Sequence, residues 1–433
     1  MSGISRRNFI QITGGAAAVS TLGVSNILLA GKSAGHVVIV GGGIGGATAA
    51  RYIKRADPAV QVTIVEPNKD YYTCFMSNEV LSGHRTLDSI KFGYKNLESM
   101  GVKIVQDYAS NIDAGKKHVV TKKSGNIAYD RCIVSPGVDF KWEMIEGLDA
   151  KVAAEKIPHA WKAGPQTALM RKQLEAMKDG GTVIIAPPPN PFRCPPGPYE
   201  RACQVADYLK NHKPKSKVLI LDAKDKFSKQ GLFMQGWKKH YGYGTDNSLI
   251  EWVKGAEGGI IEGVDAKTNT VTGSVDEYKG DVVNIIPAQK AGKIAFTAGL
   301  VNDKGWCPVN QQTFESTKHK DVYVIGDSSV ASPLPKSGYS ANSEAKVCAA
   351  AVVASLQGKD PAIPTLVNTC YSVLAPGDGI SVAMVYNFDG KKIQKVKGSG
   401  GLTPMDSSPA MRAREEQYAH SWFRNITADV FGG

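Results

Sequence analysis

The seven cysteines are the side chains of this 433-residue chain with the widest range of chemistry. They are Cys74, Cys132, Cys194, Cys203, Cys307, Cys348 and Cys370. No two of them have the C-x-x-C spacing of zinc ribbons or of c-type haem attachment. The histidines show no ligand spacing either, so we expect no metal and no haem on this chain. Because the number is odd, at least one thiol stays outside any disulfide.

Cys194 lies in a proline-rich segment, residues 187–200. Proline fixes the backbone angle φ, so this sulfur should be held in one geometry. Glu200 follows six residues later and could move a proton. We interpret Cys194 as half of a redox disulfide. The alternatives are an inert loop thiol and, for Glu200, a surface ion pair with Arg193 or Arg201.

The glycines near the N-terminus predict a dinucleotide site. An apolar strand is expected over residues 36–40 and a helix over 47–55, with the G-x-G-x-x-G pattern between them. Gly41 permits the tight turn, and Gly43 lets a pyrophosphate approach the backbone. Gly46 lets the helix pack against the strand. The N–H groups at the start of this helix would bind the phosphates.

Two acidic residues indicate which dinucleotide binds. Glu66 ends the next expected strand, 60–65, where a ribose hydroxyl is usually bound. Asp327 ends a later strand, 321–327, in a pattern that resembles the second FAD element of flavoproteins with two dinucleotide domains. A helix over 340–356 would face the flavin with its N-terminus. The pattern predicts FAD, while a helix cap is the simpler interpretation of Asp327.

The middle of the chain begins like a second dinucleotide unit. A strand is expected over 181–186, but prolines follow where a nicotinamide-binding domain has glycines. Proline has no N–H for a phosphate, and its ring blocks close approach. The fold should therefore persist without NAD(P) binding. Asp222, which ends the expected strand 217–221 at the position of a ribose-binding acid, leaves an NAD(P)-dependent disulfide reductase as an alternative.

Four stretches resemble the flavoprotein subunit of flavocytochrome c sulfide dehydrogenase. They are residues 70–74, 191–201, 335–342 and 368–372. The likeness runs along essentially the whole chain after the first thirty residues. It implies an α/β fold with two Rossmann-like, glutathione-reductase-like domains and a C-terminal α+β interface region.

The resemblance also implies roles for single residues. Cys74 would carry FAD covalently, a buried thiol being the alternative, and Lys336 belongs to the cofactor site. Cys194 and Cys370 would form a disulfide over the flavin, although from the sequence alone Cys203 is a rival partner for either. Hydrosulfide would open the bridge and leave a persulfide, and two electrons would reach the flavin.

The electron acceptor implied by the resemblance is a separate cytochrome c subunit, which alone carries haem. Sulfide:quinone oxidoreductases are similar in fold but have an apolar, membrane-facing C-terminus. The tail 411–431 of this chain is mixed in character, which predicts an amphipathic helix or a packing segment. Trp422 is expected near the substrate pocket or in the core. A membrane-surface quinone reductase and a non-catalytic electron-transfer flavoprotein remain the alternatives.

Residues 1–30 predict a removable export signal. Arg6 and Arg7 form a twin-arginine pattern, a weakly apolar stretch follows, and cleavage is expected after Ala30. The stretch is short and rich in Gly, Ser and Thr for a membrane anchor, which is the alternative. This route exports folded proteins, so we expect a periplasmic protein that acquires its cofactor first.

The remaining composition limits the partners. The net charge is +12, but the charges are scattered and no nucleic-acid-binding motif is present. An acidic protein partner is compatible with this charge, and we expect no integral membrane span. We place an FAD-binding domain at 35–147 and 289–360, a degenerate NAD-binding-like domain at 148–288 and a C-terminal interface domain at 361–433.

Overall fold

A five-stranded parallel sheet lies at the centre of the N-terminal part of the computed structural model, which describes residues 34–432. Its strand order is β20-β9-β1-β2-β5. The strands are β1 (His36–Val40), β2 (Gln61–Val65), β5 (Val102–Val105), β9 (Arg131–Val134) and β20 (Val322–Val324). Nearly continuous apolar runs suit a sheet that is covered on both faces. β20 comes from far along the chain, so two distant segments share this sheet.

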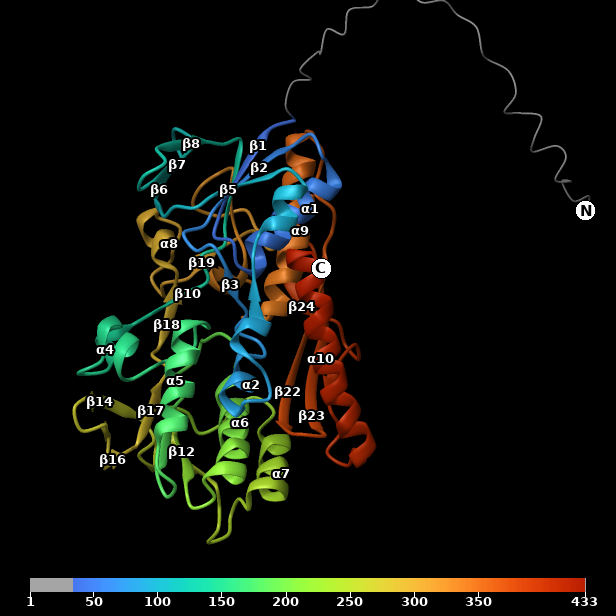
Figure 1. The fold of residues 1–433 in the computed structure, drawn as a ribbon. Helices are drawn as coiled ribbons and strands as arrows, with labels where there is room; N and C mark the ends of the chain where they lie inside the picture. Colours follow the sequence, from blue (N-terminus) through green and yellow to red (C-terminus); the bar gives the residue numbers. More distant parts are fainter. Residues whose placement is uncertain (1–33, 433) are drawn as a thin grey trace, which may run out of the picture. The chain divides into compact units, whose positions relative to one another are not determined.

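Helices α1 (Ile44–Ala56) and α9 (Gly338–Leu356) pack against one another beside this sheet. α1 begins at Ile44, three residues before the predicted start at Ala47, so its first turn lies inside the G-x-G-x-x-G pattern. α9 begins two residues before the predicted start, because the Ser337 side chain accepts a hydrogen bond from the backbone N–H of Ser340 and caps the first turn. Figure 1 shows both helices beside β1 and β2.

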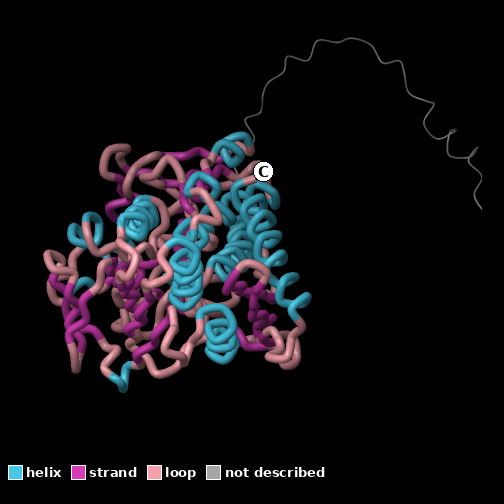
Figure 2. Tube along the Cα trace, turned by 60° about the horizontal axis from the view of Figure 1, so that its bottom comes forward, coloured by secondary structure: helices cyan, strands magenta, loops and turns pink. Residues whose placement is uncertain are grey.

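A second parallel sheet of four strands, in the order β13-β12-β11-β17, lies in the middle of the chain. Its strands are β11 (Thr182–Ala186), β12 (Lys217–Leu221), β13 (Ile250–Val253) and β17 (Val282–Ile285). Its helices are α5 (Pro165–Ala176), α6 (Gly197–His212) and α7 (Gln230–Tyr241). In Figure 2 the strands form separate groups with helices between them.

The C-terminal region is a long hairpin covered by a helix. Strands β22 (Thr365–Ala375) and β23 (Asp378–Phe388) pair antiparallel, and α10 (Pro409–Phe431) packs against both. The tail predicted as a helix or a packing segment is therefore both. Arg412 and Glu415 of α10 are buried along with its apolar face. In Figure 1 α10 runs beside the two strands.

Short elements complete the fold. The short strands are β3 (Tyr71–Tyr72), β4 (Lys91–Phe92), β6 (Ala109–Asp113), β7 (His118–Thr121), β8 (Asn126–Ala128), β10 (Val138–Phe140), β14 (Ile261–Asp265), β15 (Thr270–Gly273), β16 (Glu277–Lys279), β18 (Gln289–Ala291), β19 (Cys307–Pro308), β21 (Ser329–Val330), β24 (Ile393–Lys395) and β25 (Gly401–Leu402). The short helices are α2 (Ser77–Ser82), α3 (Lys95–Ser99), α4 (Ala150–Glu155) and α8 (Lys293–Thr297).

The fold bears on three further predictions. The α/β class with two parallel sheets is confirmed. The domain boundaries stay predictions, because the chain from residue 34 onward forms one compact unit. The export signal lies outside the described residues. Among residues 34–432 no helix is long and apolar enough to cross a bilayer.

Candidate functional site: a three-cysteine cavity beside a dinucleotide cradle

The glycine loop after β1 packs closely against other parts of the chain. Gly41 has a φ of +99°, in the left-handed region, and a Cβ there would lie 2.4 Å from the carbonyl oxygen of Ser135. A Cβ on Gly46 would lie 1.9 Å from the carbonyl oxygen of Gly41, so α1 can approach β1 only with glycine here. Gly43 is less tightly enclosed, with the Tyr71 ring 3.3 Å from its Cβ position.

Glu66 lies at the end of β2, next to this loop. One carboxylate oxygen accepts a hydrogen bond from the Gly42 N–H at 2.9 Å, and the other accepts two from Asn68. The carboxylate is thus held at the carboxyl edge of the sheet, where α/β proteins bind dinucleotides. Its predicted ribose contact stays a prediction.

Asp327 follows β20 at the same sheet edge. Its Oδ2 lies 3.6 Å from Arg193, while its Oδ1 is buried and accepts no hydrogen bond from any described residue. Burial raises the pKa of Asp327, and Arg193 and Lys336 oppose the rise. Lys336 donates to the carbonyl oxygens of Asp327 and Ser329. A buried acceptor without a partner beside a glycine cradle fits the hydroxyl-rich ribityl chain of FAD.

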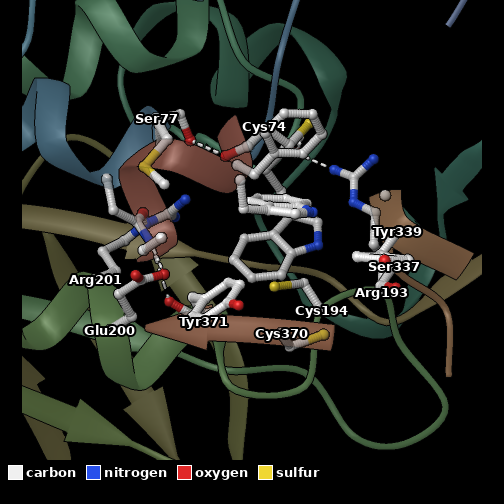
Figure 3. A pocket seen from close by; sticks show the side chains of 18 of the residues that line it. Cys74, Ser77, Arg193, Cys194, Glu200, Arg201, Ser337, Tyr339, Cys370 and Tyr371 are labelled. Carbon is white, nitrogen blue, oxygen red and sulfur yellow. Dashed lines mark hydrogen bonds between the residues drawn. The ribbon is translucent and has the colours of Figure 1, made fainter. Parts of the chain in front are cut away.

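A cavity of about 90 Å³ adjoins these residues and has three of the seven cysteines in its wall. Cys74, Cys194 and Cys370 line it together with Glu200 and Trp422. The other four cysteines are buried elsewhere. Figure 3 shows Cys194 and Cys370 near one another in the lower part of the view, and Cys74 in the upper part. Three chain segments that are far apart in sequence therefore bring their sulfurs to one space.

Cys194 is fixed by the backbone of its loop. Its φ is +55°. Its N–H donates to the carbonyl oxygen of Lys336 at 2.8 Å, so the proline segment is hydrogen-bonded to the segment that follows Asp327. Burial raises the pKa of the Cys194 thiol, and nearby Cys370 and Glu200 add to the rise. The loop backbone thus holds Cys194 in a defined position, in keeping with the fixed geometry predicted from the prolines.

Cys370 lies on β22. The Asn368 side-chain amide donates to its sulfur at 3.5 Å. Burial raises the pKa of the Cys370 thiol, while the Lys229 ammonium and the Asn368 hydrogen bond oppose the rise. All seven cysteines are free thiols in this structure, so the disulfide between Cys194 and Cys370 stays a prediction. Cys203, the rival partner, is fully buried and its sulfur accepts a hydrogen bond from Trp237.

Glu200 projects from the first turn of α6 into the cavity wall. Its Oε1 accepts the Val373 N–H at 2.9 Å, and its Oε2 accepts the Asn78 amide at 3.2 Å. Burial raises the pKa of Glu200 to about 7, against the lowering effect of these hydrogen bonds. The alternative of an ion pair is not realised, because Arg193 pairs with Asp327 and Arg201 binds neutral oxygens. A carboxyl that titrates near neutral pH is suited to proton transfer.

Cys74 lies in the loop between β3 and α2 and is half-buried. Its sulfur donates to the carbonyl oxygen of Trp161 at 3.4 Å, and the Arg193 guanidinium donates to the same oxygen. Because Arg193 also pairs with Asp327, one arginine connects Cys74 to the edge of the dinucleotide cradle. The geometry leaves the Cys74 sulfur in the cavity wall, while its covalent role stays a prediction.

The second dinucleotide-like unit has an enclosed acid at the position expected to bind a ribose. Asp222 is fully buried, and its carboxylate accepts hydrogen bonds from the Tyr199 hydroxyl at 2.6 Å, the Trp252 indole at 3.1 Å and the Lys224 ammonium at 2.7 Å. Every one of these donors belongs to the chain itself. Asp222, the residue that favoured NAD(P) in the sequence, therefore has no side exposed for a ribose.

Several residues of the site carried no motif in the sequence. Lys229 is buried and donates to the carbonyl oxygen of Cys370. The sequence points to Arg193 and Arg201 only as ion-pair partners of Glu200, and no motif marks Asn78. Trp422, which is expected from the sequence near the substrate pocket or in the core, lies in the cavity wall and stacks on Tyr339 with ring centroids 6.2 Å apart. Only long-range packing reveals the roles of Lys229 and Asn78, because each comes from a different element.

Comparison with known families matches three parts of the chain. Residues 167–287 match the central part, and residues 362–431 the flavin-binding part, of the flavocytochrome c sulfide dehydrogenase flavoprotein chain. Residues 35–172 match the pyridine nucleotide-disulphide oxidoreductases. The flavoprotein chain from Chlorobaculum thiosulfatiphilum is 52% identical over 45 residues, which are 10% of this chain and 94% of that sequence. The chain belongs to the flavocytochrome c sulfide dehydrogenase flavoprotein family.

Flavocytochrome c sulfide dehydrogenase flavoproteins are a family of sulfide-oxidising FAD oxidoreductases, so the predictions of family and FAD are confirmed at that level. More distant relatives include the mitochondrial sulfide:quinone oxidoreductase of mouse, 22% identical over 67% of this chain and 65% of that protein. This chain thus spans slightly less than two thirds of the mouse protein.

Solved structures confirm the fold expected of a flavocytochrome c sulfide dehydrogenase flavoprotein. The sulfide:quinone oxidoreductase of Aquifex aeolicus superposes with a TM-score of 0.68 at 15% identity, covering 92% of each chain. A ferredoxin reductase from Rhodopseudomonas palustris gives a TM-score of 0.63 at 16% identity, over 81% of this chain and 82% of that one.

Proposed function

We propose that this chain oxidises hydrogen sulfide at the cavity of Cys194 and Cys370 and passes the electrons through FAD to a c-type cytochrome. The observation that carries the proposal is the convergence of these two thiols and Glu200 on one cavity. The backbone bond from Cys194 to Lys336 joins that cavity to the orphaned carboxylate of Asp327.

In the resting enzyme Cys194 and Cys370 form a disulfide. Hydrosulfide attacks one of the two sulfurs, which breaks the bridge and makes a new S–S bond. The products are a persulfide on one cysteine and a thiolate on the other, so atoms and charge balance. A second hydrosulfide takes up the outer sulfur as HSS⁻, which leaves Cys194 and Cys370 as two reduced thiols that hold the two electrons. These electrons would pass to bound FAD as the disulfide re-forms.

Glu200 handles the protons of this sequence. With a pKa of about 7 it is partly ionised at neutral pH, so it can accept a proton from hydrogen sulfide or from the persulfide and release it again. The Val373 N–H and the Asn78 amide hold the carboxylate in place at the cavity wall.

Bound FAD supplies an acceptor that takes two electrons together and releases them singly. We place it in the Gly41–Gly46 cradle, with Glu66 and Asp327 as hydrogen-bonding partners and Arg193 and Lys336 as cations beside it. We propose a covalent bond from Cys74. The mass of the acid-denatured protein tests this, since a Cys74 peptide carrying one added FAD is expected and an unmodified peptide would contradict it.

We further propose that the protein works in the periplasm, after export by the twin-arginine route, with a haem-bearing cytochrome c subunit as partner. The sequence of residues 1–30 and the family support this. Quinone reduction is the second candidate, because the sulfide:quinone oxidoreductases match over much of the chain. Purified protein given sulfide should reduce a c-type cytochrome at least about tenfold faster than a soluble ubiquinone analogue. The opposite preference would support the quinone enzyme.

Anaerobic bleaching of the flavin by sulfide tests the cysteine chemistry. Cys194→Ala and Cys370→Ala should each lose bleaching by about a hundredfold or more, because no bridge remains to be attacked. Cys203→Ala is the matched control, since Cys203 lies on α6 but outside the cavity. Full bleaching in the Cys194→Ala variant would rule out the disulfide mechanism and favour a non-catalytic flavoprotein.

A further inference from the structure

Lys229 is a buried cation without a carboxylate partner. Its exposure is 6%, and its ammonium donates to the carbonyl oxygen of Cys370 at 3.2 Å and to the Ser372 hydroxyl at 2.9 Å. Over residues 34–432 no acidic side chain lies within ion-pair distance of it. Both bonds go to β22, the strand that carries Cys370. A buried charge with only neutral partners is costly unless an anion forms beside it.

The backbone of Lys229 is also strained. Its φ is +60° at the start of α7, in the left-handed region that a lysine seldom occupies. The fold therefore holds this side chain against β22 at some cost in free energy. Such a conformation persists only where the surrounding structure fixes it, so it is a second observation that singles out the position.

The ionisable groups around Lys229 come from four segments. They are Cys370 of β22, Glu200 of α6, Cys194 of the proline segment and Glu415 of α10. Glu415 is engaged by the hydroxyls of Ser381 and Thr403. Glu200 is bound by Val373 and Asn78. Glu200 titrates near neutral pH whether or not the bridge is closed. The two sulfurs are the groups that gain a negative charge when a disulfide between them opens.

We infer that Lys229 is a positioning residue that compensates a negative charge on the sulfur attached to Cys370, either thiolate or persulfide, when the bridge opens. This inference rests on the proposed redox role of Cys194 and Cys370. Opening the bridge creates one thiolate from a neutral disulfide and a hydrosulfide, and the new anion moves from solvent into the cavity wall. The Lys229 ammonium offsets the cost of removing this sulfur anion from water.

The ionisation of Cys370 tests this without any turnover. The holoprotein is reduced with a phosphine and alkylated with iodoacetamide from pH 6 to pH 11, and the Cys370 peptide is quantified by mass. Lys229→Met should raise the midpoint of Cys370 alkylation by about one pH unit or more, a tenfold change in ionisation. Lys229→Arg should stay near the wild type. Lys226→Met, which changes an exposed lysine on the same segment, should shift nothing.

An unchanged midpoint in folded Lys229→Met would overturn the inference. If that variant does not fold, the alkylation midpoints of Cys370 and Cys194 are compared in the wild-type protein. Cys370 should ionise at lower pH than Cys194, and the reverse order would overturn the inference. Failure of the proposed function is recognised separately, as wild-type flavin that sulfide does not bleach. That result would leave the alkylation midpoints intact.

Discussion

Two strand–helix–strand units of this chain, β1–α1–β2 and β11–α6–β12, share one topology and differ in what they expose. Each has two parallel strands in direct register with a helix between them. The loop after β1 is made of glycines, and the loop after β11 is made of prolines. In the first unit the helix begins within the glycine loop, with Gly43 as its N-cap. In the second, the segment before the helix presents Cys194 and its first turn presents Glu200 to a cavity.

The acids that end the second strands differ in the same way. Glu66 accepts hydrogen bonds at the rim of the glycine loop, whereas Asp222 is enclosed by Tyr199, Trp252 and Lys224. In the second unit the strand–helix–strand topology is kept, while the acid at the expected ribose position is occupied by contacts within the chain. Four changes would test how far the two units have diverged.

The largest effect is expected from Gly46→Val. Its side chain would meet the Gly41 carbonyl oxygen, so α1 must move away from β1. We expect purified protein with less than about a tenth of the wild-type flavin absorbance, since more than 1.4 kcal/mol of strain is over tenfold in binding. Pro188→Ala in the second unit should keep its flavin. Full flavin in the Gly46→Val protein would mean that the glycine loop is not the cofactor cradle.

Asp222→Asn should lower the free energy of unfolding by about 3 kcal/mol, because it leaves the Lys224 ammonium buried without a charge partner. Chemical denaturation measures this loss. Glu251→Gln, which breaks an exposed pair with Lys217 in the same sheet, should cost less than about 0.5 kcal/mol. Equal losses in the two variants would contradict a structural role for Asp222.

Glu200 should make stability fall with rising pH. Its folded pKa of about 7 lies above the ordinary 4.5, so the folded state binds the proton more tightly than the unfolded state. The stabilisation is complete below pH 4.5 and is lost as pH rises through 7. Relative to Glu200→Gln, the wild type should lose roughly 1–3 kcal/mol of unfolding free energy across this window. A constant difference between the two proteins would contradict the raised pKa.

The smallest effect is expected from opening the proline loop. A Pro187→Gly, Pro189→Gly double variant regains two backbone N–H groups, but Asp222 stays bonded to Tyr199 and Trp252. NADH should therefore bleach its flavin no faster than it bleaches the wild type. Rapid bleaching by NADH would show that prolines alone had closed the site, and that the two units differ by their loops only.

Much of the fold was predictable from local pattern. The apolar run His36–Val40 and the strand Lys217–Leu221 have the predicted bounds, because buried parallel strands are apolar along their whole length. α6 was not predicted, since prolines precede it and its apolar residues are interrupted. Glu200 was recognised only by its distance from Cys194. Its pKa near 7 depends on burial under β22, which lies more than 160 residues away in the sequence.

The sequence by itself determined the glycine loop after β1, the proline loop after β11 and the family, because each depends on residue type at short spacing. Only the tertiary structure decided that Cys74, Cys194 and Cys370 line one cavity and that Lys229 lies beside Cys370. It also decided that Asp222 is occupied. These facts depend on contacts between distant segments, and on burial that changes the energy of a charge, which no local pattern encodes.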